Sequence, residues 1–409
     1  MTRPSLHRWS RRQILASGAG LALSLGFPRR VLAGSASRNL IIWWNNGGWD
    51  PTFVFDPHFE VNGLARDPNS TLASAGGISF ADAESRPAVR AYFERWGHRS
   101  CVINGLSVGS ISHDGCSRLV LTGVRVGGAD LGTLVASQSL GSRPLPFVSL
   151  GGPRYPGQQG EVLTPVGPLL SGFVQDTEPA HADIDATREE LLLEYIQREA
   201  DLRTNQPYLD SWSQAVERLR VLRQQPDLLN IGANPTEEEL ISMGIELLAT
   251  QTCSVLGLQA PLPSLVRWDS HDQNQENQEQ AFESSFSHLD TLLTTLATTE
   301  DGDGTLLDHT TVLVLSEMGR TPRLNPSMGK DHWPYTSAMV VGAGVGGGRV
   351  VGVSNETLVG QKVDFSSGAS SSSGSTLFPQ NLVAGVLQSF DIDPGGPLPG
   401  VAPFTAWQD

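Results

Sequence analysis

The sequence predicts an α/β protein in which helices cover both faces of a mostly parallel sheet. Apolar runs of strand length alternate with segments of helical periodicity along the chain, which is the pattern of such sheets. The chain has 409 residues, 39% of them hydrophobic, which is ample for a large core. We find no internal repeat, so we expect a single domain over residues 34–409.

Five apolar runs have the length and composition of buried strands. The first, residues 39–46 (NLIIWWNN), ends in a tight turn that leads to Asp50. The clearest, residues 310–317 (TTVLVLSE), ends on a carboxylate, Glu317. The other three expected strands are residues 100–106, 146–152 and 335–344.

Helical periodicity is clearest in residues 277–297, where apolar side chains recur at spacings of four, three, four and three residues. These side chains are Phe282, Phe286, Leu289, Leu293 and Leu296. Further helices are expected at 81–97, at 117–123 with Gly123 ending the helix, and at 378–390. We also expect a helical excursion beside the sheet at about 187–225, and a flexible Ser-rich surface loop at 366–375.

Residues 1–33 are typical of a twin-arginine signal peptide. Arg11 and Arg12 precede an apolar run, and Ala33 ends a stretch of small residues suited to cleavage. The apolar run is too short and glycine-rich for a comfortable membrane span of about 20 residues. We therefore expect the twin-arginine export machinery as a partner, no stable membrane anchor after cleavage, and a periplasmic or secreted location.

The charge of the chain limits its partners. The segment 1–33 holds six arginines and no acidic residue, so its removal changes the net charge from −15 to −21. Such an acidic protein is unsuited to nucleic acid or to an anionic membrane surface, but it attracts cations. Its three cysteines allow at most one disulfide, so an exported form depends on its core for stability.

Four clusters place carboxylates or imidazoles where strand ends and loops can aim them inward. In parallel sheets, ligands bind at the carboxyl ends of the strands. One Asp after a strand is usually a cap or turn residue, but four clusters together favour a site. Carboxylates with neutral imidazoles suit a divalent ion, whose charge also offsets the repulsion between carboxylates. The clusters are Asp50; Ser112-His113-Asp114; Asp269-Ser270-His271; and Glu317 with Asp331-His332.

The stretch TVLVLSEMGRTPRLN…GKDHWPYTSAMVVGAGVGGGRVVG, residues 311–352, resembles the hallmark of the bacterial family catalogued as domain of unknown function 1501. Members of that family are typically exported by the twin-arginine route, are related to sulfatases, and are placed in the alkaline phosphatase superfamily. Three shorter blocks resemble the family's other motifs in the family's order. They are WWNNGGWDP, SHDGCSRLVLTG and WDSHDQN.

The resemblance implies an alkaline-phosphatase-like three-layer sandwich that hydrolyses phosphate or sulfate esters, with a small anionic ester as substrate. It also implies one or two divalent ions, which are zinc, manganese, calcium or magnesium. Asp269, His271 and His332 resemble the ligands of one ion, and Asp331 belongs to the same retained set. Asp50 and Glu317 resemble ligands of the other ion. Arg320 or Lys330 is a candidate to neutralise a bound anion, and for Arg320 an exposed turn position is an equally favoured interpretation.

The sequence departs from the active superfamily pattern at two places. Glu317-Met318 stands where a sulfatase or phosphatase has Asp-His, and Met is a poor ligand for a hard ion, so we expect Met318 in the core. His113 stands where a sulfatase carries its nucleophile, with Ser112 beside it. For His113 a role as ligand or general acid/base is favoured over a covalent one. Cys116 is expected to be a small buried residue at a helix start.

Two functions remain open from the sequence. The first is an extracytoplasmic metal-dependent hydrolase of phosphate or sulfate esters, which the retained carboxylates and histidines favour. The second is a non-catalytic member that serves as a metal-binding or ligand-binding scaffold, which Met318 and His113 favour.

Overall fold

The computed structural model describes residues 38–160, 162–165 and 235–409, together with residues 191, 194, 198 and 222. The expected signal peptide at 1–33 lies outside the described residues, and so does the expected helical excursion at 187–225 apart from those four positions. Within the described part of the chain, no helix has both the length and the apolar character needed to cross a membrane.

A mixed sheet forms the centre of the molecule, with eight strands among the described residues. Five of the seven neighbouring strand pairs in this part are parallel, and the two pairs made by β13 are antiparallel. The predicted α/β class with a mostly parallel sheet is therefore confirmed. From edge to edge the strands are β14 (Arg349–Val351), β4 (Ser100–Ser107), β13 (Tyr335–Gly342), β10 (Thr310–Ser316), β1 (Asn39–Asn45), β7 (Val255–Gln259), β5 (Phe147–Ser149) and β6 (Leu163–Pro165).

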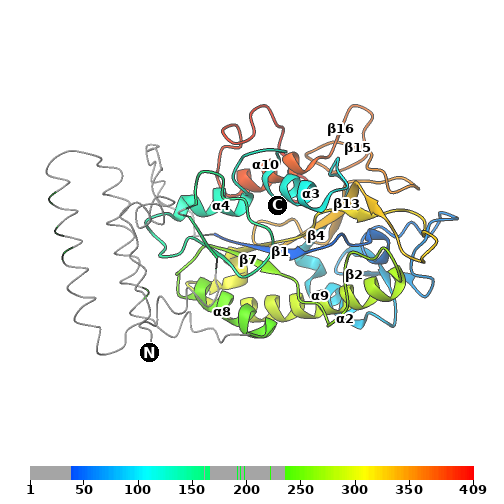
Figure 1. Ribbon diagram of the computed structural model, residues 1–409, viewed down its shortest axis with the longest axis horizontal. Helices are drawn as coiled ribbons and strands as arrows, with labels where there is room; N and C mark the ends of the chain where they lie inside the picture. Colours follow the sequence, from blue (N-terminus) through cyan, green and yellow to red (C-terminus); the bar gives the residue numbers. More distant parts are fainter. Residues whose placement is uncertain are drawn as a thin grey trace, which may run out of the picture.

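Helices cover both faces of the sheet, which gives a three-layer sandwich (Figure 1). Alternate residues of β1 point to opposite faces of the sheet. Ile41 and Trp43 belong to the apolar cluster on one face, and Ile42 and Trp44 belong to the cluster on the other. The first cluster includes side chains of α2 (Pro87–Trp96), α8 (Glu237–Ala249) and α9 (Asn274–Thr298). The second includes side chains of α3 (His113–Thr122), α4 (Leu131–Ala136) and α10 (Pro379–Ser389).

Short elements complete the described chain. Four hairpins are β2 (Thr71–Ala75) with β3 (Ile78–Asp82), β8 (Glu300–Asp301) with β9 (Gly304–Thr305), β11 (Gly319–Arg320) with β12 (His332–Trp333), and β15 (Lys362–Val363) with β16 (Ser375–Thr376). The 3-10 turns are η2 (Pro51–Phe53), η3 (Gly97–Arg99), η4 (Ser137–Ser139) and η6 (Leu306–His309).

Two predicted helices have the wrong boundaries. The helix expected at 81–97 begins only at Pro87, because residues 78–82 pair as β3 with β2 and Pro87 occupies the first helical turn. The helix expected at 117–123 begins at His113, although it ends before Gly123 as predicted. The remaining expected strands and helices are present with shifts of a few residues at their ends.

The long helix α9 confirms its predicted apolar stripe, since all five predicted side chains are buried. Phe282 and Phe286 pack edge-on or tilted against Phe55, and Phe282 also stacks with Trp49. Trp49 follows β1, so the turn after the central strand is fixed against α9. This packing places the residues after β1 at the carboxyl edge of the sheet.

The loops that carry the predicted site residues all lie at one edge of the sheet. The carboxyl ends of β1, β4, β7 and β10 lie on the same edge, because each of these strands runs in the same direction. The antiparallel strand β13 contributes its amino end to that edge. The predicted site residues lie in the segments that leave or enter the sheet there.

Candidate metal centre

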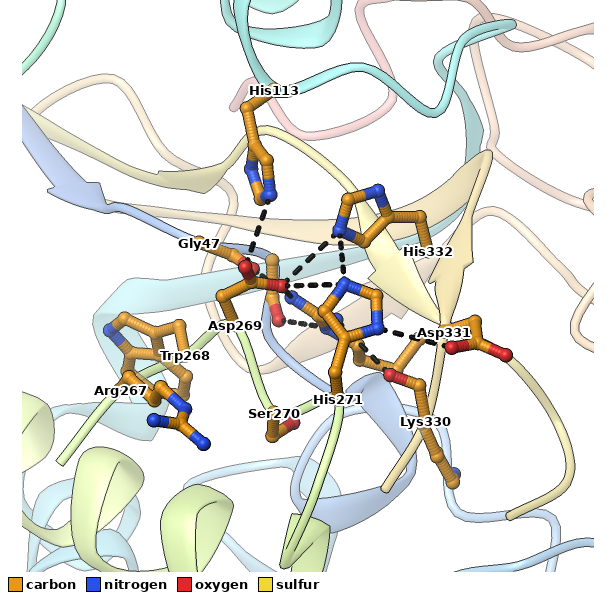
Figure 2. A network of polar contacts seen from close by, with 12 residues as sticks. Gly47, His113, Arg267, Trp268, Asp269, Ser270, His271, Lys330, Asp331 and His332 are labelled. Atoms are coloured by element: carbon orange, nitrogen blue, oxygen red, sulfur yellow. Dashed lines mark hydrogen bonds and ion pairs between the residues drawn. The ribbon is translucent and has the colours of Figure 1, made fainter. Parts of the chain in front are cut away.

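The centre of the site is a triangle of one carboxylate oxygen and two imidazole nitrogens (Figure 2). Asp269 Oδ1 lies 3.2 Å from His271 Nε2 and 3.2 Å from His332 Nε2. The two Nε2 atoms are 2.9 Å apart. Ligands of a tetrahedral zinc ion are separated by about 3.3 Å, given metal–ligand bonds of about 2.0–2.1 Å. The triangle therefore has nearly the dimensions of three ligands around one ion.

His113 joins the triangle from the other face of Asp269. It is the first residue of α3, and its Nε2 lies 3.5 Å from Asp269 Oδ2. Ligand atoms of His113, Asp269 and His332 all lie within 4.8 Å of one another. His113 and Asp269 are 156 residues apart in the sequence, and Asp269 and His332 are 63 apart, and the edge of the sheet brings them together.

Each of the three imidazoles is held through its Nδ1 atom by an oxygen that can only accept. His113 Nδ1 donates to Glu317 Oε1 at 2.7 Å, and His332 Nδ1 donates to the carbonyl oxygen of Ile111 at 2.7 Å. His271 Nδ1 donates to Asp331 Oδ1 at 3.1 Å. These contacts assign the proton to Nδ1 and direct the Nε2 lone pairs inward, as in histidine ligands of metals.

The converging lone pairs need a positive charge. Two unprotonated Nε2 atoms at 2.9 Å repel each other unless a proton or a cation lies between them. Hydrogen bonds to Asp269 and then to Glu317 raise the pKa of His113 to about 9, against the opposing effect of burial. Burial acts to raise the pKa of Asp269, but hydrogen bonds from His113 and Arg320 outweigh it and lower that pKa well below its usual range.

The donor set fits a divalent ion that accepts nitrogen ligands. Side chains of His271, Asp269 and His113 are 46%, 40% and 36% exposed, so the centre is open to solvent. Three imidazoles and one carboxylate favour zinc or manganese over calcium or magnesium, which prefer all-oxygen sites. Asp269, His271 and His332 would hold the ion, with His113 as a fourth contact.

Two loops pack closely to bring His271 beside His332. Lys330 N donates to the carbonyl oxygen of Ser270 at 2.9 Å, and Asn274 N donates to that of Met328 at 3.0 Å. Gly329 allows this approach, because a Cβ atom there would lie 1.9 Å from the carbonyl oxygen of His271. The glycine therefore sets the spacing of the two histidine-bearing loops.

Glu317 is fully buried and lies beneath His113. Its Oε1 atom also accepts from Gly47 N at 2.8 Å, and its Oε2 atom accepts from Ser316 Oγ at 3.3 Å. Gly47 has a φ of +127°, and a Cβ there would lie 2.8 Å from Asp269 N, so only glycine suits this turn. Glu317 thus orients an imidazole, and Met318 beside it is fully buried in the apolar core as expected.

Arg320 is fully buried and every nitrogen of its guanidinium has a protein partner. Its Nε donates to the carbonyl oxygen of Gly48 at 2.9 Å, and one terminal nitrogen donates to that of Lys330 at 3.1 Å. The other terminal nitrogen contacts the carbonyl oxygen of Gly47 and lies 2.6 Å from Asp269 Oδ1. This arrangement fixes Asp269 and leaves the guanidinium no exposed surface for an anionic ligand.

Asp50 and Lys330 form a buried ion pair away from the imidazoles. Lys330 Nζ lies 2.6 Å from Asp50 Oδ2 and also donates to the carbonyl oxygen of Ala65 at 2.6 Å. Burial lowers the pKa of Lys330, although Asp50 acts in the opposite direction. The Lys330 side chain points away from His271 and His332 in Figure 2. These two predicted site residues therefore do not join the triangle.

Ser112 and Cys116, which lie close to His113 in the sequence, differ in access to solvent. Ser112 is exposed at the amino end of α3. Cys116 is fully buried, and burial raises the pKa of its thiol to about 11, as expected for a structural cysteine.

Several residues that complete the site were not foreseen. The carbonyl oxygen of Ile111 orients His332, and the amide of Gly47 orients Glu317. Every residue has these main-chain groups, so the sequence does not reveal which of them take part in a site. Asn274 and Gln278 contact Asp50 from α9. Their spacing of four residues places both on one face of the helix, and polar side chains on the buried face of an amphipathic helix were a usable signal.

Comparisons with known proteins support the resemblance for part of the chain. Residues 248–368 match the family described as "Protein of unknown function (DUF1501)". This range contains Asp269, His271, Glu317, Arg320 and the 330–332 segment. No curated protein matches the sequence.

Solved structures similar to this chain have low identity to it. They include the lipoteichoic acid synthase LtaP from Listeria monocytogenes, with 9% identity over 90% of this chain and 74% of that chain, and a TM-score of 0.39. A protein in the alkaline phosphatase superfamily from Vibrio parahaemolyticus has 8% identity, coverages of 96% and 78%, and a TM-score of 0.39. Phosphonate monoester hydrolase of Agrobacterium radiobacter has 10% identity, coverages of 91% and 79%, and a TM-score of 0.37. Likenesses at these TM-scores carry no argument about activity.

Proposed function

We propose that this protein is an extracytoplasmic metal-dependent hydrolase of phosphate or sulfate esters, with a divalent ion on Asp269, His271 and His332. The observation that carries the proposal is the triangle of 2.9–3.2 Å between their ligand atoms, with Nδ1 of each imidazole already held by an oxygen. A bound ion would polarise the ester and lower the pKa of a bound water.

The chain's own residues supply the orientation of the site. Arg320 and Glu317 fix Asp269 and His113 from below, and Asp331 fixes His271 from the rim. His113 keeps its expected role as a ligand or a general acid/base, with its Nε2 at the open side of the carboxylate. The export route by twin-arginine signal and the periplasmic or secreted location remain part of this proposal.

A second candidate function is a non-catalytic, metal-binding scaffold. One observation favours it: Arg320 and Lys330, the two cations expected to hold an anionic ester, are fully buried and occupied by internal partners. In an active hydrolase of this kind, the bound ion itself would therefore have to neutralise the ester's charge.

Elemental analysis of the purified folded protein tests the proposal. We expect at least one zinc or manganese ion per chain in the wild type, and its loss in Asp269→Asn and His332→Gln. The matched control is His98→Gln, which removes an exposed imidazole outside the site and should retain the ion. Absence of metal in the wild type after saturation and gel filtration would contradict the proposal.

Turnover separates the two candidate functions. The metal-loaded wild type is assayed with p-nitrophenyl phosphate and p-nitrophenyl sulfate, beside Asp269→Asn and His98→Gln. Hydrolysis by the wild type and the control, lost in Asp269→Asn, supports the hydrolase. Tight metal binding with no turnover of either ester, or of a wider ester panel, supports the scaffold.

A further inference from the structure

The resemblance to two-metal enzymes implies that Asp50 and Glu317 bind a second ion. In the structure, however, these two carboxylates contact different sets of partners. Glu317 contacts His113, Gly47 and Ser316. Asp50 contacts a different set of partners, and within the described residues no hydrogen bond or ion pair joins it to Glu317. Among the described residues, the side chains that converge as possible metal ligands are His113, Asp269, His271 and His332, and Asp50 is not one of them.

The carboxylate of Asp50 has no acceptor position left for a metal. Its Oδ1 accepts from Thr52 N at 3.2 Å and from Thr52 Oγ at 2.7 Å. Its Oδ2 accepts from Asn274 Nδ2 at 3.0 Å and lies 2.6 Å from Lys330 Nζ. A carboxylate presents about four lone-pair positions, and four donors fill them here.

The charge of Asp50 is also compensated. Asp50 and Lys330 are both fully buried, and a buried carboxylate is tolerated only with a partner of opposite charge. Lys330 is one of only two lysines in the chain, the other being Lys362. Its ammonium group donates both to Asp50 and to the carbonyl oxygen of Ala65, so it is held in place from two sides.

We infer that the Lys330 ammonium takes the place of a second metal ion at Asp50, so that the centre holds one divalent ion and a fixed internal cation. The inference rests on the proposed function for the first ion only. It assigns Asp50 and Lys330 as positioning residues: their pair anchors the start of the segment that carries Asp331 and His332. A divalent ion could reach Asp50 only if Lys330 left it.

The first test is the number of ions bound. At saturating zinc or manganese, the wild type should bind one ion per chain, and Asp50→Asn should still bind one. Because Asp50→Asn leaves a buried ammonium without its carboxylate and can prevent folding, the same count is made on the double variant Asp50→Asn/Lys330→Met, in which both charges are gone. Two ions in the wild type, with one lost in either variant, would overturn the inference.

The second test needs no bound metal. Unfolding in urea with a chelator present is measured for wild type, Asp50→Asn, Lys330→Met and the double variant. Each single change should raise the unfolding equilibrium constant by roughly 100-fold or more. The double variant should raise this constant by much less than the product of the two single effects. The control cycle is Arg95 with Asp290, a solvent-accessible ion pair at 2.8 Å whose side chains are 53% and 25% exposed, and its coupling should be no more than about fivefold.

The two tests distinguish failure of this inference from failure of the proposed function. If the wild type binds no ion but Asp50 and Lys330 are strongly coupled, the hydrolase proposal fails and the internal cation stands. If one ion binds at Asp269 but the coupling is no larger than in the control, the internal cation is refuted and the hydrolase proposal survives.

Discussion

Asp331 is the most accessible of the groups that hold the three imidazoles. It is 60% exposed, accepts from His271 Nδ1, and accepts from Asn325 Nδ2 at 3.2 Å. We expect Asp331→Asn to weaken metal affinity about 10- to 100-fold, since removal of a carboxylate behind a ligand histidine has that effect. The measurement is a competition titration against a metal-sensitive dye.

The matched control for Asp331→Asn is Asp303→Asn, which alters an exposed carboxylate in a turn distant in sequence. It should leave the dissociation constant unchanged. Equal affinities for wild type and Asp331→Asn would show that Asp331 does not orient His271.

His58 provides a pH-dependent contribution to stability. Its Nε2 lies 3.1 Å from Asp56 Oδ1, and this hydrogen bond is the main reason that its pKa is raised to about 9. Because the folded-state pKa exceeds the unfolded value, the contribution is complete below about pH 6.5 and is lost as the pH rises through about 9. His58→Gln should therefore destabilise more at about pH 6 than at about pH 10.

Urea unfolding of wild type and His58→Gln at these two pH values checks this expectation. His98→Gln is the control, because His98 is exposed. A His58→Gln penalty that grows toward high pH would contradict the assigned direction.

At the residue scale, the sequence identified the site's members better than their roles. Asp269, His271 and His332 stand in short blocks at strand ends, and they do converge. Arg320 and Lys330 were expected to meet an anion. Arg320 instead contacts main-chain carbonyl oxygens and Asp269, and Lys330 contacts Asp50, which follows β1. Contacts across more than two hundred residues of sequence cannot be inferred from local pattern.

At the scale of elements, the close contact between the two histidine-bearing loops gives a sharp prediction. Gly329→Ala would place a Cβ atom 1.9 Å from the carbonyl oxygen of His271, so the loops must separate. We expect a loss of about 1–3 kcal/mol in the free energy of unfolding, together with weaker metal binding. Urea unfolding and the dye titration measure the two effects.

Gly396→Ala is the control for this change, because nothing lies within 4 Å of a Cβ atom at Gly396. Gly396→Ala should change neither the free energy of unfolding nor the metal affinity. Normal metal binding by Gly329→Ala would show that the spacing of the loops is not set at this residue.

Element types were predictable from the sequence, and element directions were not. The apolar run at 335–344 was correctly expected as a strand, but its antiparallel course depends on the hairpin β11–β12, which has no hydrophobic pattern of its own. Similarly, residues 81 and 82, the last two of β3, were taken for the start of a helix, because Ile78–Asp82 is stabilised by pairing with Thr71–Ala75 rather than by local periodicity.

At the scale of the whole molecule, the metal should act as a cross-link. Its expected ligands come from three separate segments of chain, and an ion that binds only the folded state adds stability. At 100 times its dissociation constant the gain is about 2.7 kcal/mol. We expect chelation to lower the Tm of the wild type, and added zinc or manganese to restore it, in a calorimetric scan.

Asp269→Asn serves as the control for this effect on the whole molecule, and its Tm should not respond to added metal. An equal rise in Tm in this variant would place the stabilising ion elsewhere on the protein.

The three-layer arrangement itself was foreseen, because continuous apolar strands require helices on both faces of the sheet.

The order of the central sheet has a consequence for how the chain folds. β1 pairs with β10 at Asn39 and Thr310, positions separated by 271 residues. The central strand β1 therefore cannot pair with β10 until the last quarter of the chain is present. The entropy cost of closing so long a loop is incurred before the strands gain any free energy from pairing. Refolding should be slow, and a ribosome must have released most of the protein before its central strand has both neighbours.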